Sequence, residues 1–299
     1  MNILGKCNLC PRNCLVNRTK ENGVCGCSDK MVIARASLHM WEEPCISGET
    51  GSGTIFFSGC NLKCIFCQNY QISNEIIGST VTIEEFSNIC LNLEKQGANN
   101  INLVTPTPYV PLIIEGIKLA KQKGLKIPIV YNTSSYENVD TIKMLDGIID
   151  IYLPDLKYFN DDYAIKYSHA KDYFKYASST IKEMYKQVGK PIFNKDGIMT
   201  KGIIVRHMML PGLLDDSKEI IKYLYETYGN NIYISIMNQY TPIKKFDRFT
   251  ELNNKVSDND YNELVNYACD LGIEKAFIQE GETQSESFIP DFLNQVLPL

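Results

Sequence analysis

The chain has 299 residues, of which 44% are hydrophobic and 22% are charged. This composition is typical of a globular protein, and the net charge of −5 argues against a nucleic-acid-binding face spread over the whole molecule. The longest uncharged run, residues 98–114, is too short for a membrane span and contains asparagines and prolines. The first residues show no secretory signal, so we expect a cytoplasmic protein without disulfides and with neither membrane nor nucleic-acid partners.

The first 53 residues are rich in cysteine, glycine and polar residues, and we expect them to form an irregular N-terminal module that ends in a flexible joint. After residue 53, short apolar runs alternate with helical patterns. Strands are expected at residues 54–57, 101–104, 127–131, 148–153, 202–209, 232–237 and 276–279. Helices are expected at residues 82–96, 109–123, 137–146, 161–188, 215–228 and 258–271.

This alternation predicts βα units and a parallel sheet over residues 54–299. Six such units followed by a seventh strand fit a partial or complete βα barrel. A doubly wound open sheet is the alternative, and the sequence pattern does not separate the two. In a βα barrel the active site lies at the carboxyl ends of the strands, so the residues that follow the predicted strands are candidates for function.

The eleven cysteines are clustered, with five in residues 7–27 and three in residues 60–67. In a reducing compartment such clusters indicate metal binding or catalysis. Cys60, Cys64 and Cys67 follow the first predicted strand, in a loop where three thiolates can converge. Iron–sulfur clusters normally take four cysteines, so three ligands would leave one iron open for chemistry. Three free or zinc-binding cysteines are the alternative.

The spacing Cys-x3-Cys-x2-Cys, with Phe66 just before the last cysteine, resembles the radical S-adenosylmethionine (SAM) superfamily. Further motifs are similar to those of the activating enzymes of glycyl-radical enzymes, in the branch that resembles pyruvate formate-lyase-activating enzyme. They are Glu42-Glu43-Pro44, Gly51-Ser52-Gly53, Cys67-Gln68-Asn69-Tyr70, Asn132-Thr133, Asp155-Leu156-Lys157, Arg206 with Pro211-Gly212, and Met237-Asn238-Gln239-Tyr240.

The resemblance implies a partial (β/α)6 TIM-like barrel of the radical SAM type and a 4Fe–4S cluster held by Cys60, Cys64 and Cys67. It implies that SAM chelates the open iron and is cleaved to methionine and a 5′-deoxyadenosyl radical, which abstracts hydrogen from the substrate. The implied partners are a separate glycyl-radical enzyme and an electron donor such as flavodoxin or ferredoxin. A radical SAM enzyme with another substrate, or a non-catalytic zinc or iron–sulfur protein, is the alternative.

The resemblance also assigns roles to residues at the strand ends. It places Asn132, Thr133 and Asp155 in a site for a monovalent cation and the SAM carboxylate, whereas a helix cap and a surface acid paired with Lys157 are the alternative. Further cofactor-binding candidates are Arg206, Asn69, Met237 and Phe66, whose backbone is expected to meet the adenine.

The second predicted strand ends at Thr105-Pro106-Thr107, where many radical SAM proteins have Gly-Gly-Glu. This sequence has no carboxylate there. We expect the hydroxyls and backbone carbonyls of Thr105 and Thr107 to accept from the SAM amino group, and a rigid proline turn is the alternative.

The N-terminal cysteines are expected to bind a second metal, either zinc or another iron–sulfur cluster. Five cysteines compete for four places, and the preferred set is Cys7, Cys10, Cys14 and Cys25, which leaves out Cys27. A metal would stabilise a module that lacks a periodic apolar face, and a redox-active or merely reduced patch of cysteines is the alternative.

Some conspicuous residues are expected to be structural. His207 should face away from Arg206 and pack under the helices. Glu42 and Glu43 are expected to lie in a solvated turn, and a position at the mouth of the active site is the alternative. Cys90 and Cys269 are expected in the core because they fall within helical patterns.

Overall fold

The computed structural model describes residues 3–279, 292 and 297–298. Within these residues, ten strands form one sheet in the order β10-β9-β8-β6-β5-β4-β2-β1-β3, with β7 beside β8. The strands are β1 (Met31–His39), β2 (Ser52–Phe57), β3 (Ser79–Val81), β4 (Ile101–Val104), β5 (Ile129–Thr133), β6 (Ile151–Pro154), β7 (Ile192–Phe193), β8 (Met199–Met208), β9 (Tyr233–Met237) and β10 (Ala276–Ile278). The α-helices are α1 (Pro44–Ser47), α2 (Tyr70–Asn74), α3 (Ile83–Lys95), α4 (Val110–Gln122), α5 (Val139–Lys143), α6 (Asp161–Ser168), α7 (Tyr173–Val188), α8 (Leu214–Tyr228) and α9 (Asp258–Asp270). Short 3-10 helices lie at Ile3–Lys6, Thr107–Tyr109, Gly229–Asn231 and Thr250–Asn253.

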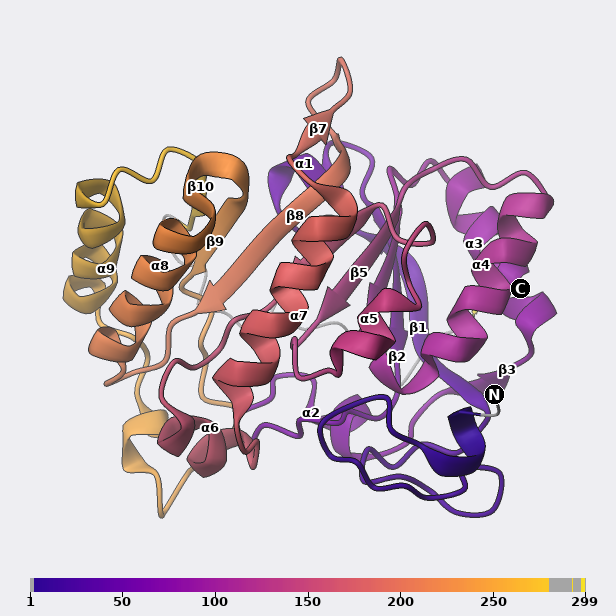
Figure 1. The fold of residues 1–299 in the computed structure, drawn as a ribbon, viewed down its shortest axis with the longest axis horizontal. Coiled ribbons are helices and arrows are strands. Elements are labelled where there is room, and N and C mark those ends of the chain that lie inside the picture. The colour runs from indigo at the N-terminus through magenta and orange to yellow at the C-terminus, as the bar shows by residue number, and fades with distance from the viewer. Residues whose placement is uncertain (1–2, 280–291, 293–296, 299) are drawn as a thin grey trace.

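The sheet is a partial barrel. Its central strands, from β2 through β4, β5, β6, β8 and β9 to β10, run parallel, whereas β1 and β3 add antiparallel strands at one edge. The described strand order runs from β10 to β3 without closing into a ring. The N-terminal segment lies across the carboxyl ends of the strands, and β7 projects at the opposite end (Figure 1). The expected partial βα barrel is therefore confirmed.

The hydrophobic core has two layers. The larger one fills the space between the sheet and the outer helices, where Val205 of β8 belongs to the same cluster as Ile220 of α8. A smaller cluster on the inner face of the sheet joins Ile46 of α1 to Val130 and Ile204. Side chains alternate along a strand, so the consecutive residues Ile204 and Val205 face opposite sides of the sheet. This alternation directs a set of polar side chains inward, beyond the inner apolar cluster.

His207 illustrates the outward face. It is buried, and its ring nitrogens lie 2.8 Å from the carbonyl oxygen of Leu156 and 2.9 Å from the hydroxyl of Ser217. Its expected structural role under the helices is confirmed. Burial lowers the pKa of His207 to about 4, so the imidazole is neutral at physiological pH.

Three expectations from the sequence were wrong. The first 53 residues are not irregular throughout, because β1 pairs with β2 and the boundary expected after residue 53 falls inside β2. The helix expected over residues 161–188 is two helices, since His169 and Asp172 adopt left-handed backbone conformations between them. Cys269 is exposed, because α9 buries Tyr261, Leu264 and Ala268 instead; Cys90 is buried as expected.

In the described part of the chain, no helix is long and apolar enough to cross a membrane. All eleven cysteines lie in that part, and none of them is in a disulfide.

Candidate active site

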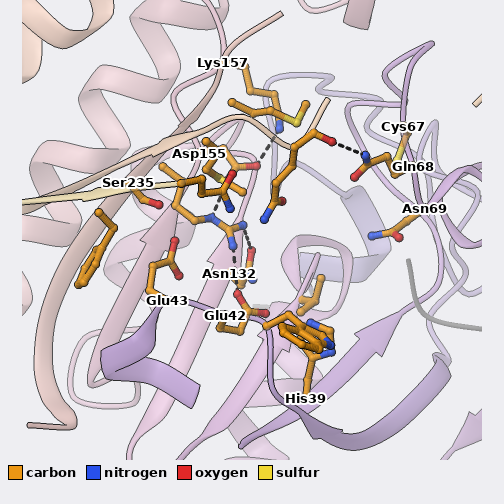
Figure 2. A pocket seen from close by; sticks show the side chains of 18 of the residues that line it. His39, Glu42, Glu43, Cys67, Gln68, Asn69, Asn132, Asp155, Lys157 and Ser235 are labelled. Carbon is orange, nitrogen blue, oxygen red and sulfur yellow. Dashed lines mark hydrogen bonds and ion pairs between the residues drawn. The ribbon is translucent and has the colours of Figure 1, made fainter. Parts of the chain in front are cut away.

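A cavity of about 420 Å³ opens at the carboxyl ends of the parallel strands. Figure 2 shows Asn132 and Asp155 on the wall formed by the strands, and Cys67 and Asn69 on the opposite side. These residues come from β5, the end of β6, and the loop of residues 58–69 after β2, which we call the cysteine loop. The fold thus brings the cysteine motif and the strand-end residues to one site, as expected for the carboxyl end of a βα barrel.

Hydrogen-bond donors already point at two thiols of the cysteine loop. The backbone N–H of Leu62 donates to Sγ of Cys60 at 3.4 Å, and the hydroxyl of Ser168 donates to Sγ of Cys64 at 3.0 Å. Cys64 and Cys67 line the cavity, and their pKa values respond to the charge of Cys60 nearby. Such hydrogen bonds to sulfur are typical of thiolate ligands in iron–sulfur proteins.

The three thiols are compatible with a cluster, because each thiolate of an iron–sulfur cluster binds a different iron and the sulfurs need not converge on one point. Burial raises the pKa of Cys64 to about 12, an effect that the charge of Lys157 opposes. Cluster binding would therefore release protons from these thiols.

Arg206 is the centre of a polar network on the strand side of the cavity. Its Nε donates to Oδ1 of Asp155 at 2.9 Å, one terminal nitrogen donates to Asn132 at 2.5 Å, and the other donates to Glu42 at 3.2 Å. Asn102 of β4 donates to the other oxygen of Glu42 at 2.9 Å. The Arg206 side chain is only 13% exposed, so these contacts compensate a nearly buried charge.

Glu42 and Glu43 lie on the cavity wall with little exposure, so the expected solvated turn is wrong and the alternative position at the active-site mouth is confirmed. Burial raises the pKa of both carboxyls, and Arg206 opposes that effect. Burial by itself would lower the pKa of Arg206, but Asp155, Glu43 and Glu42 raise it above its ordinary value. Oε2 of Glu43 is buried and has no hydrogen-bond partner among the described residues, while the Glu43 carboxyl also contacts Ser235 on the same cavity wall.

Asp155 is paired on both sides. Its Oδ2 accepts from Nζ of Lys157 at 2.7 Å, while Arg206 binds Oδ1. Burial would raise the pKa of Asp155, but the charges of Lys157 and Arg206 hold it below its usual value. The expected pairing with Lys157 is therefore present, but in a buried network and not on the surface. A monovalent cation at this carboxylate stays a prediction.

Thr133 and Thr107 do not face the cavity. Thr133 follows Asn132 in β5, so its side chain points to the other face of the sheet, where the hydroxyl donates to Glu137. Tyr131 donates to the same carboxyl at 2.8 Å, and Thr107 also hydrogen-bonds to it. Burial raises the pKa of Glu137 to about 7 despite these bonds. This buried acid was missed in the sequence, where it appeared only as the start of a helix.

The remaining candidates also divide into residues that line the cavity and residues that do not. Phe66, Asn69 and Met237 line the cavity, as their assignment to the cofactor site requires. Thr105 is half-buried at the end of β4 in a left-handed conformation, with its N–H donating to the carbonyl of Asn132 at 3.0 Å. Its side chain is not part of the cavity wall. Gln68 was not singled out, although its side-chain amide donates to the carbonyl of Gln239 at 2.8 Å and joins two sides of the cavity (Figure 2).

The N-terminal cysteines lie in a separate place. Cys7, Cys10, Cys14 and Cys25 line a second cavity of about 20 Å³, which Cys27 does not line. The thiol of Cys27 instead lies 3.5 Å from the carbonyl oxygen of Ser58. The metal expected at these cysteines stays a prediction.

Residues 54–224 match the radical SAM superfamily in a comparison with known families. The uncharacterized protein MJ0674 of Methanocaldococcus jannaschii is 28% identical over 278 residues, which cover 89% of this chain and 75% of that protein. SuiB of Streptococcus suis, in a crystal structure with bound S-adenosylmethionine, matches at 16% identity with a TM-score of 0.50, over 75% of this chain. Methylornithine synthase (PylB) matches at 14% identity with a TM-score of 0.50, over 73% of this chain and 60% of that structure.

The chain spans 49% of SuiB, and at these identities the structural matches show a shared fold. The family match carries more weight, because it covers more than half of the chain and begins in the strand that leads into the cysteine loop. This match establishes that the chain belongs to the radical SAM superfamily, whose members use a 4Fe–4S cluster and SAM, and the cysteine loop stands at the cavity as that family requires.

Proposed function

We propose that this chain is an enzyme that cleaves SAM reductively at a 4Fe–4S cluster held by Cys60, Cys64 and Cys67. The observation that carries the proposal is the cysteine loop, which places Cys64 and Cys67 on the cavity wall, with hydrogen bonds from Leu62 to Cys60 and from Ser168 to Cys64. When bound, the cluster supplies the electron that breaks a carbon–sulfur bond of SAM, and the resulting 5′-deoxyadenosyl radical abstracts hydrogen from the substrate.

The polar residues of the cavity would orient SAM. Lys157 and Arg206 present positive charges for its carboxylate, and Asp155 holds both of them in place through its two oxygens. A monovalent cation at Asp155, which the resemblance implies, would replace one of these partners. Asn132 fixes the direction of Arg206 through the bond to its terminal nitrogen.

Glu43 is our proposed acceptor for a cationic group in the cavity. It lies on the cavity wall with an unpaired oxygen. In many radical SAM proteins the carboxylate comes from the end of the second barrel strand, but here that strand is followed by Thr105 and Thr107, which do not line the cavity. A buried carboxylate oxygen without a donor is costly, and a bound ammonium group would satisfy it.

We further propose that the substrate is a protein, as in the activating enzymes of glycyl-radical enzymes. Trp41 and Ile278 line the cavity while remaining 61% and 40% exposed, so they offer apolar contacts to a macromolecule at its rim. SuiB has been crystallised with its precursor peptide SuiA, and a peptide substrate of another type is the second candidate for this chain. The electron would come from a flavodoxin or ferredoxin.

Incubation of the anaerobically reconstituted protein with SAM, reduced flavodoxin and a pyruvate formate-lyase-type protein tests this proposal. Electron paramagnetic resonance should show a glycyl radical on the added protein, together with stoichiometric 5′-deoxyadenosine. The exposed-cysteine variant Cys269→Ser should behave like the wild type. SAM cleavage without a glycyl radical would exclude the activating role and leave the radical SAM reaction with another substrate.

A further inference from the structure

Four cysteines of the N-terminal segment surround one small space. Cys7, Cys10, Cys14 and Cys25 line the cavity of about 20 Å³, which we call the N-terminal cysteine cavity. Gly23 lies against it: a Cβ at that position would stand 3.3 Å from Sγ of Cys25 and 3.6 Å from Sγ of Cys14. The two sulfurs therefore occupy the space that any larger residue would need.

Two arginines at this cavity lack anionic partners. Arg12 and Arg18 both line it, and no ion pair among the described residues includes either of them. Arg18 is 1% exposed, and its Nε has no hydrogen-bond acceptor. Its terminal nitrogens donate only to the carbonyls of Pro108 and Ser28. A buried guanidinium without a counter-charge is costly, so these positions favour an anionic group in the cavity.

We propose that Cys7, Cys10, Cys14 and Cys25 bind one divalent ion of the zinc class as four thiolates. Four thiolates and one divalent cation carry a net charge of −2, which the two arginines balance. The size of the cavity favours a single ion, because a space of about 20 Å³ holds little more than one water-sized atom and a cubane cluster has eight atoms. This inference does not depend on the proposed function.

The thiols must turn inward to bind the ion. Among the described residues, no three Cys, His, Asp or Glu side chains are close enough together to hold a metal ion. A cysteine has a single side-chain rotation, through which its sulfur can turn toward the centre of the cavity. Cys27 is not included, because it does not line the cavity and its thiol lies against the carbonyl of Ser58, although the same thiol also contacts the Cys25 side chain.

The position of the cavity gives the ion a structural role. Arg12 lies between two of the ligands, and its Nε donates to the carbonyl of Asn61 at 2.8 Å in the cysteine loop. Its other nitrogens donate to the carbonyls of Leu62 and Ser168, each within 3.2 Å, and of His169. Ser168 in turn donates to Sγ of Cys64. An ion at the N-terminal cysteine cavity would therefore fix the loop that holds the catalytic cluster.

Metal analysis of the full-length Cys60→Ala/Cys64→Ala/Cys67→Ala variant, grown with zinc and iron available, tests the site without the catalytic cluster. We expect about one zinc per chain and no sulfide. Cobalt substitution should give the visible absorption of a tetrahedral thiolate site. Iron with sulfide, or less than about a tenth of a zinc ion per chain, would overturn the proposal.

Added substitutions in that variant test the ligand set. Cys14→Ser should lose most of the zinc, whereas Cys27→Ser and Cys269→Ser should retain it, with far-ultraviolet circular dichroism confirming that all three are folded. Retention by Cys14→Ser, or loss in Cys27→Ser, would show that the ligand set is wrong. The structural role predicts that chelation of the zinc speeds hydrogen exchange in residues 58–69, and unchanged exchange there would refute it.

Discussion

Glu137 allows a quantitative test of the packing beneath the site. Its carboxyl is buried and receives bonds from Tyr131 and Thr133, yet burial raises its pKa from an ordinary 4.5 to about 7. Since the folded-state pKa is the higher one, the folded protein holds this proton more tightly than the unfolded chain. The corresponding stability is fully present below pH 4.5 and is lost as the pH rises through 7. Between pH 5 and pH 8 the loss should be about 2–3 kcal/mol.

The Glu137→Gln variant has no proton to lose and keeps an acceptor for Tyr131. Urea unfolding of both proteins at several pH values, under reducing conditions, gives the difference between their free energies of unfolding, in which the other titrating groups cancel. This difference should move by about 2–3 kcal/mol in favour of the variant from pH 5 to pH 8. A pH-independent difference would refute the reasoning, because Glu137 would then titrate alike in both states.

Two further predictions concern the cofactor site. The change Asp155→Ala should weaken SAM binding roughly tenfold to a hundredfold in calorimetric titrations, because Lys157 and Arg206 lose the carboxylate that holds them. Affinity equal to that of the wild type, with and without potassium salt, would remove Asp155 from the SAM site. The change Ser168→Ala should make the reduction potential of the cluster more negative. In the wild type the hydrogen bond to Cys64 stabilises the reduced cluster, which carries more negative charge, and the variant lacks this bond. An unchanged potential in a redox titration would contradict this role.

The parts of the site that the sequence predicted are those that follow from local periodicity. The alternation of strands and helices placed the cysteine loop, Asn132, Asp155 and Arg206 at strand ends, and the structure brings them to one cavity. The same alternation should have excluded Thr133, because it directly follows Asn132 in an extended strand and must face the other way. The resemblance to the activating enzymes outweighed that geometric argument.

The parts that were missed depend on contacts between distant segments. Glu42 looked solvated because its partner Arg206 is 164 residues away, and only the curled sheet brings them together. Glu137 looked like an ordinary helix start because its contact with Thr107, which follows the neighbouring strand, exists only in the folded sheet, although Tyr131 and Thr133 are close to it in the sequence. The strand Met31–His39 was missed because the cysteine-rich surroundings suggested an irregular segment, although it pairs with β2 along its length.

The central claim is that Cys60, Cys64 and Cys67 hold the cluster at which SAM is cleaved. The most direct test measures 5′-deoxyadenosine formed per chain by anaerobically reconstituted wild type and by Cys64→Ala, with dithionite as reductant. The wild type should form it, and Cys64→Ala should form none while remaining folded, because the cluster loses one of its three protein ligands. Unchanged 5′-deoxyadenosine production by Cys64→Ala would contradict the account.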